Sequence, residues 1–186
     1  MALGSTVYKA ELSVADIGRS YYAEHVLALA RHPSETEERL MVRLLAFALH
    51  AHTDLRFGRG ISTEDEPDLW QKDATGVTDL WIDVGLPDER SVRKACGRAR
   101  RVVVLAYGGR KLDMWWQQNA DALARNRNLE VITVSPEETS QITALAERSM
   151  RLSCTIQEGS AWIGSDRSGC NVEPKCLKRA SDERDQ

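Results

Sequence analysis

The sequence predicts an α/β protein in which a mixed β-sheet is flanked by helices. Strand-like and helix-like segments alternate along most of the chain, and this order is typical of such a sheet. Residues 102–106 form a continuous apolar run, as expected for a central strand covered on both faces. The chain has 186 residues, which is enough for one domain with a sizeable core.

The composition is that of an ordinary globular protein, with 42% hydrophobic and 28% charged residues. The net charge of −3 means that any contact with nucleic acid needs a local basic patch. No apolar run reaches the ~20 residues of a membrane helix, and the first residues lack a signal-peptide pattern. We therefore expect a cytoplasmic protein without a membrane partner. The cysteines show no metal-binding spacing, so we interpret them as reduced thiols: Cys96, Cys154, Cys170 and Cys176.

The N-terminal part is predicted to form a β-hairpin followed by a helix. Residues 6–14 alternate between polar and apolar side chains, which indicates a strand. Residues 21–30 form a second apolar run, and a strand is favoured there because a short loop can pair it with the first. Ser34 and Glu37 fit a capping box that opens a helix over residues 34–50. The apolar stripe of this helix contains Leu40, Met41, Leu44, Leu45 and Ala48.

The rest of the chain continues the alternation of strands and helices. An acidic loop over residues 63–68 interrupts the first strands. The predicted strands cover residues 55–59, 68–72, 79–84, 102–106, 129–134, 152–157 and 161–164, and the predicted helices cover residues 89–99, 111–125 and 136–148.

These elements predict a single domain over residues 1–178. The terminal hairpins, residues 4–31 and 149–173, are expected to pair as a small antiparallel subdomain. Residues 32–148 would form the main core, and residues 179–186 a flexible tail.

Two aspartates are predicted to meet on neighbouring strands. Pro67 can begin a strand but cannot lie in its middle, so Asp68 stands at a strand start. Asp79 and Asp83 share one face of the strand over residues 79–84, opposite its apolar face. A hairpin can then bring Asp68 beside Asp83. Two such carboxylates repel each other, and a hard cation such as Mg²⁺ relieves the repulsion.

A glutamate from the first helix could complete this metal site. Glu38 lies at the edge of the apolar stripe and is preferred, with Glu35 as the alternative. A plainer interpretation stays open, because acidic residues are also common at strand starts and in the first turn of helices.

Four segments resemble the YaeQ family of bacterial proteins. They are RHPSETEER at residues 31–39, DEPD at 65–68, LWIDVGLPDER at 80–90 and WWQQN at 115–119. The resemblance covers nearly the whole chain up to about residue 173. It implies a fold similar to the PD-(D/E)XK nucleases, in which a helix glutamate, a "PD" aspartate and a (D/E)-x-K strand bind Mg²⁺ and activate water against a phosphodiester.

Carried over to this sequence, the resemblance implies that Glu38, Asp68 and Asp83 are catalytic residues and metal ligands. Gly85 occupies the position of the motif lysine, whose charge a glycine cannot supply. Lys94 on the following helix, or Lys72 on the strand of Asp68, would replace it.

Two functions follow from the resemblance. The first is a Mg²⁺-dependent, nuclease-like protein that acts on nucleic-acid phosphodiesters and is catalytically degenerate if no lysine replaces Gly85. The alternative is a non-catalytic binding or regulatory protein linked to transcription elongation, with the transcription machinery as partner. A basic stretch over residues 90–101 could bind phosphates or form a solvated helix surface. Residues 107–110 are interpreted as a turn.

Overall fold

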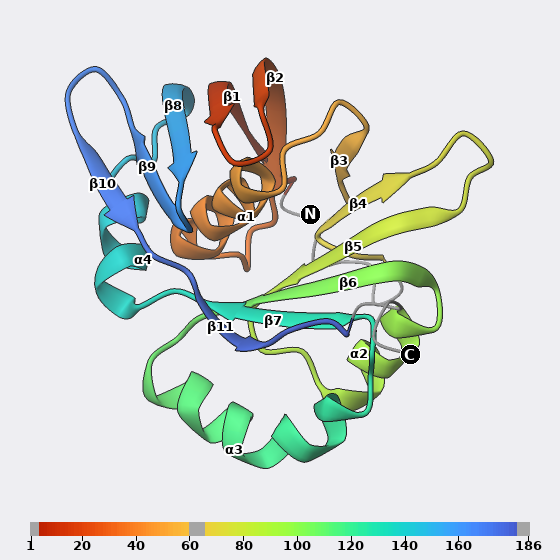
Figure 1. Cartoon of the computed structure of the whole chain (residues 1–186). Helices are drawn as coiled ribbons and strands as arrows, with labels where there is room; N and C mark the ends of the chain where they lie inside the picture. Colours follow the sequence, from red (N-terminus) through yellow and green to blue (C-terminus); the bar gives the residue numbers. More distant parts are fainter. Residues whose placement is uncertain (1–3, 60–65, 182–186) are drawn as a thin grey trace.

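The computed structural model describes residues 4–59 and 66–181 of the chain. Two mixed β-sheets, called sheet A and sheet B, lie on either side of one helix, and two further helices cover the far face of sheet B (Figure 1). The α/β architecture predicted from the sequence is confirmed at this level. None of the helices in the described residues is long and apolar enough to cross a membrane.

Sheet A unites the two terminal hairpins in the order β10-β9-β8-β1-β2. β1 pairs with β8 in parallel and with β2 in antiparallel orientation, so the prediction of an antiparallel subdomain is wrong. The parallel pair joins segments about 140 residues apart, a separation that local sequence patterns do not report. The strands are β1 (Thr6–Asp16), β2 (Tyr21–Arg31), β8 (Ser149–Gln157), β9 (Ser160–Gly164) and β10 (Gly169–Val172).

Sheet B has the order β11-β7-β6-β5-β4-β3. β3, β4 and β5 form an antiparallel meander, whereas β5, β6 and β7 run parallel. The strands are β3 (Leu55–Phe57), β4 (Leu69–Lys72), β5 (Thr78–Val84), β6 (Ala99–Ala106), β7 (Leu129–Thr133) and β11 (Lys175–Lys178). β10 and β11 were not predicted. Each is four residues long.

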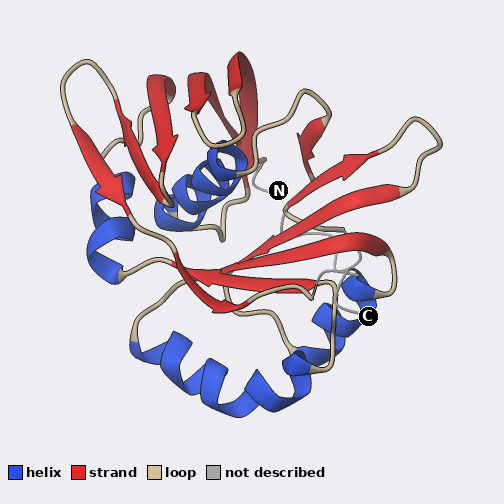
Figure 2. Ribbon diagram, in the orientation of Figure 1, coloured by secondary structure: helices blue, strands red, loops and turns tan. Residues whose placement is uncertain are grey.

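Helix α1 (Glu37–Leu49) lies between the two sheets, as Figure 2 shows. Every residue from Leu40 to Ala48 is buried, because both faces of the helix meet a sheet. The helix begins three residues later than predicted. Its N-cap is Thr36, whose hydroxyl accepts a hydrogen bond from the Arg39 backbone N–H, whereas the Ser34 hydroxyl bonds to His32.

The remaining helices are α2 (Glu89–Cys96), α3 (Arg110–Ala124) and α4 (Pro136–Thr143). α2 and α3 pack on the far face of sheet B, while α4 contacts α1 and β10 (Figure 1). α2 and α4 are shorter than predicted. Pro136 follows the N-cap Ser135 of α4, which forms a capping box with Glu138.

Two apolar cores result from this arrangement. The larger core fills the space between the sheets around α1, and the smaller one lies between sheet B and helices α2 and α3. The C-terminal segment is held to sheet B, because the Lys178 ammonium donates hydrogen bonds to the carbonyls of Asn126 and Leu129. Residues 63–65 of the predicted acidic loop and residues 182–186 of the predicted tail lie outside the described residues.

Candidate functional site

The pairing of β4 with β5 brings Asp68 and Asp83 together. Leu69 pairs with Ile82 in an antiparallel ladder, so the preceding residue Asp68 lies opposite Asp83. Ile82 and Val84 point into the larger core, whereas Trp81 belongs to the smaller core on the other face of the sheet. The side chain of Asp83 shares the face of Trp81, as the alternation of the strand predicts.

The carboxylate of Asp68 is buried, with 8% of the residue exposed, and both of its oxygens are bonded. Oδ1 accepts a hydrogen bond of 2.6 Å from Nη2 of Arg39, which also makes an ion pair. Oδ2 accepts a hydrogen bond of 2.7 Å from the backbone N–H of Val84. The negative charge of Asp68 is therefore balanced within the protein.

The carboxylate of Asp83 is less well compensated. Its Oδ2 accepts a hydrogen bond of 3.0 Å from the indole N–H of Trp81. The pKa of Asp83 is raised to about 6, chiefly by burial and also by the neighbouring charge of Asp68. The hydrogen bonds from the Trp81 indole and the Asp68 backbone and the charge of Arg39 act in the opposite direction. A carboxyl group that titrates near neutral pH can both donate and accept a proton.

The two glutamates predicted from the first helix have other partners. Oε1 of Glu38 accepts a hydrogen bond of 2.7 Å from the hydroxyl of Thr139 on α4. Glu35 is 3% exposed and precedes the helix. Its oxygens bond to Nη1 of Arg39 and, bidentately, to Arg43, at 2.8–3.0 Å. Glu35 therefore joins Asp68 through Arg39, whereas Glu38 connects α1 to α4.

Three residues of this region were missed in the sequence: Arg39, Arg43 and Tyr107. Arg39 links Glu35 to Asp68, and Arg43 is 1% exposed in the middle of an apolar helix. A charged residue inside an apolar stripe is a signal for a buried ion pair, and it could have identified Arg43. Tyr107 follows β6, and burial raises the pKa of its hydroxyl to about 12, with charge effects from Arg39, Glu38 and Asp68. The hydroxyl of Tyr107, in the segment predicted as a turn, is therefore within electrostatic range of these charged groups.

The three positions considered for the motif lysine, Gly85, Lys72 and Lys94, differ in their surroundings. Gly85 has a φ of +110°, which side-chain-bearing residues rarely adopt, and its N–H donates to the Leu105 carbonyl. The Lys72 ammonium lies 3.9 Å from the ring centroid of Trp70. Lys94 is on the exposed side of α2, opposite the buried Val92 and Ala95.

The basic stretch after Asp88 lies largely on the surface and is paired with acids. Arg100 forms ion pairs with Asp79 and Asp73, so the carboxylate of Asp79 is engaged away from Asp68. Arg101 pairs with Glu130 on β7. Such exposed pairs contribute little to stability, and they reduce the positive field available to a phosphate.

As arranged, the residues present do not fit a Mg²⁺ ion. Among residues 4–59 and 66–181, no group of three or more His, Cys, Asp or Glu side chains is placed to hold a metal. Arg39 donates to Asp68, and Glu38 is bonded to Thr139. The guanidinium beside Asp68 repels a divalent cation and occupies an oxygen that a metal would need. The roles predicted for Glu38, Asp68, Asp83 and Lys94 stay predictions.

Comparisons with known proteins agree with one another and cover nearly the whole chain. A family model described as "YaeQ protein" matches residues 1–174. "Uncharacterized protein YaeQ" of Escherichia coli K12 is 44% identical over 173 residues, covering 92% of this chain and 95% of that protein. The protein of the same name from Salmonella typhi is 44% identical over 174 residues, covering 93% and 96%.

Two solved structures share the fold. The crystal structure of YaeQ protein from Xanthomonas axonopodis pv. citri is 51% identical, with a TM-score of 0.90, and the match covers 94% of this chain and 98% of that one. The structure of YaeQ protein from Pseudomonas syringae is 35% identical, also with a TM-score of 0.90, and covers 94% and 97%.

Proposed function

The chain belongs to the YaeQ family, and from that premise we propose that it is a non-catalytic binding protein built on a nuclease-like framework. The observation that carries this proposal is the ion pair between Arg39 and Asp68. In a metal-dependent nuclease, the carboxylate in this place must be free to bind the cation. Here the guanidinium supplies the positive charge permanently.

The arrangement of elements supports the nuclease-like framework. α1 carries Glu38, the Pro67-Asp68 pair lies at the start of β4, and β5 carries Asp83. The ladder between β4 and β5 places both aspartates at the end of the sheet where the parallel strands β5 and β6 also finish. Ligands of α/β proteins commonly bind at the carboxyl ends of parallel strands.

Metal binding and cleavage test this proposal directly. Titration calorimetry with Mg²⁺ or Mn²⁺ is expected to give no saturable heat, and labelled DNA and RNA are expected to stay intact with either metal. Arg39→Gln, which removes the competing charge, provides the matched comparison. Cleavage that disappears in Asp83→Ala, or Mn²⁺ density between Asp68 and Asp83 in a soaked crystal of the unaltered protein, would overturn the proposal.

A second candidate is a Mg²⁺-dependent phosphodiesterase acting on nucleic acid. The observation that favours it is the raised pKa of Asp83 beside a second carboxylate, a combination that is frequent in active sites. The cleavage assay separates the two functions. A binding role predicts instead that an immobilised chain retains a stable partner. The transcription machinery implied by the resemblance is the first to test, by probing the eluate for RNA polymerase.

A further inference from the structure

Strands β2 and β3 each end a sheet, so each has one backbone edge without a strand partner among residues 4–59 and 66–181. β2 is the longer of the two and pairs with β1 at eleven consecutive positions without a bulge. It contains no proline and no lysine, two of the devices that protect exposed edges. At its end, the Ala30 carbonyl accepts a hydrogen bond from Arg43 of α1.

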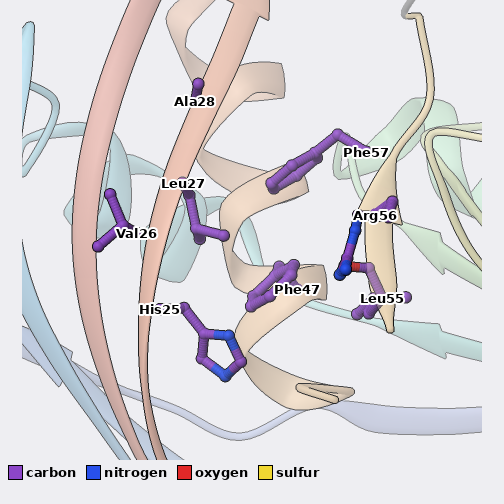
Figure 3. A pocket seen from close by; sticks show the side chains of 8 residues that line it. All are labelled: His25, Val26, Leu27, Ala28, Phe47, Leu55, Arg56 and Phe57. Carbon is purple, nitrogen blue, oxygen red and sulfur yellow. The ribbon is translucent and has the colours of Figure 1, made fainter. Parts of the chain in front are cut away.

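A pocket of about 420 Å³ lies between these two edges. It is lined by residues 25–28 of β2, Phe47 of α1 and residues 55–57 of β3 (Figure 3). Phe47 lies between the two strands at the base of the pocket, 4.9 Å from the His25 ring and 5.5 Å from the Phe57 ring, measured between centroids. The base is therefore a row of aromatic rings, which suits an apolar side chain.

The permanently charged side chain among the residues that line the pocket is a cation, Arg56. This residue is exposed, and its Nη1 donates to the backbone carbonyls of Thr53 and Leu55. No carboxylate is among the lining residues. Burial lowers the pKa of His25, and the charge of Arg56 lowers it further, so this imidazole stays neutral at pH 7. A complementary ligand thus carries apolar side chains and a negative charge.

We propose that the gap between β2 and β3 binds an extended, acidic peptide segment of a partner protein as an added β-strand. The free edge of β2 supplies main-chain hydrogen bonds, and alternate side chains of the peptide enter the aromatic pocket. A carboxylate of the peptide pairs with Arg56. Asp68 and Asp83 are not among the residues that line this pocket, so the inference goes beyond the proposed function and does not depend on it.

The surroundings favour a single segment over a second copy of the chain. β3 bounds the far side of the pocket, and a β2 strand from a second copy would bring its own β1 neighbour into the place of β3. A lone extended peptide has no such neighbour. It would also shield the side chain of Val26, which is 89% exposed on the outer face beside the edge.

The probe is a fluorescein-labelled peptide of eight residues in which valine alternates with threonine, ending in two aspartates. Fluorescence anisotropy with the full chain is expected to show saturable binding. A peptide with lysines in place of the aspartates is expected to bind about tenfold more weakly, because it repels Arg56. A peptide with a central proline, which cannot form the ladder, is expected not to saturate.

Charge reversal provides the decisive comparison. Arg56→Glu is expected to weaken binding of the acidic peptide and to strengthen binding of the lysine peptide, whereas Arg125→Glu, an equal charge change at the C-cap of α3, leaves both unchanged. The gain of lysine-peptide binding also shows that Arg56→Glu is folded. Equal binding of all three peptides, or no saturation at about 1 mM, a threshold far above typical peptide affinities, overturns the proposal. Dimerisation in analytical ultracentrifugation that is lost in Val26→Lys but kept in Val7→Lys would assign the gap to a second copy instead.

Discussion

The two ends of helix α1 differ in whether their buried polar groups have partners. Towards the N-terminal end, a continuous chain of ion pairs runs from Arg43 in the middle of the helix through Glu35 and Arg39 to Asp68. At the C-terminal end, Nε2 of His50 is buried without a hydrogen-bond partner among the described residues, and burial lowers its pKa to about 4. The ion-paired side chains stay charged, whereas the unpaired imidazole of His50 stays neutral, because burying an unpaired charge costs free energy.

The largest expected effect comes from breaking the paired end. Arg43→Met removes two of the donors to Glu35 and the hydrogen bond to the Ala30 carbonyl. Glu35 then remains buried with Arg39 alone, so we expect a loss of about 3–5 kcal/mol in the free energy of unfolding. Urea denaturation monitored by tryptophan fluorescence measures it.

The control for this variant is Arg151→Met, which breaks an exposed ion pair with Glu11 and is expected to change stability by less than about 0.5 kcal/mol. Similar losses in the two variants would mean that the pairs at the helix start contribute no more than surface pairs do.

The buried imidazole of His50, at the C-terminal end of α1, is expected to make the stability of the protein depend on pH. The lowered pKa of His50 means that the unfolded chain binds a proton more readily than the folded one below about pH 6.5, the ordinary histidine value. Stability should therefore fall as the pH drops from about 6.5 towards 4. In His50→Phe this loss should be smaller by about 2 kcal/mol, as measured by urea denaturation at pH 6.5 and 4.5.

The matched control is His52→Phe, two residues away, where 42% of the imidazole side chain is exposed. It is expected to keep the pH dependence of the unaltered protein. An unchanged slope in His50→Phe would mean that the imidazole is hydrated and not buried in solution.

The contrast between the ends also explains what the sequence could predict. The order of most helices and strands along the chain, and the proximity of Asp68 to Asp83, follow from local alternation and a hairpin, which a single sequence reveals. The pairing of Arg39 with Asp68 joins residues 29 positions apart, and the sequence contains many acids that could have been chosen. The start of α1 was misplaced for a local reason, because Ser34 bonds to His32 and leaves capping to Thr36.

Asp83 lies between the two extremes, because it is partly buried and is stabilised by hydrogen bonds from the Trp81 indole and the Asp68 backbone. Because its folded-state pKa of about 6 exceeds the ordinary aspartate value, the folded protein binds the extra proton. Its contribution to stability is present below about pH 4 and is lost as the pH rises through 6. Asp83→Asn should therefore be more stable than the unaltered protein at pH 7, by about 1 kcal/mol once solvent screening is allowed for.

This smallest effect is also the most informative, because an amide keeps the shape and the Trp81 hydrogen bond while removing the charge. Asp79→Asn, on the same strand, removes a carboxylate paired with Arg100 and is expected to show no gain. Thermal unfolding at pH 4.5 and 7 compares the two variants. A loss of stability at pH 7 in Asp83→Asn would show that Arg39 compensates Asp83 as it does Asp68, and the difference between the paired and unpaired carboxylates would disappear.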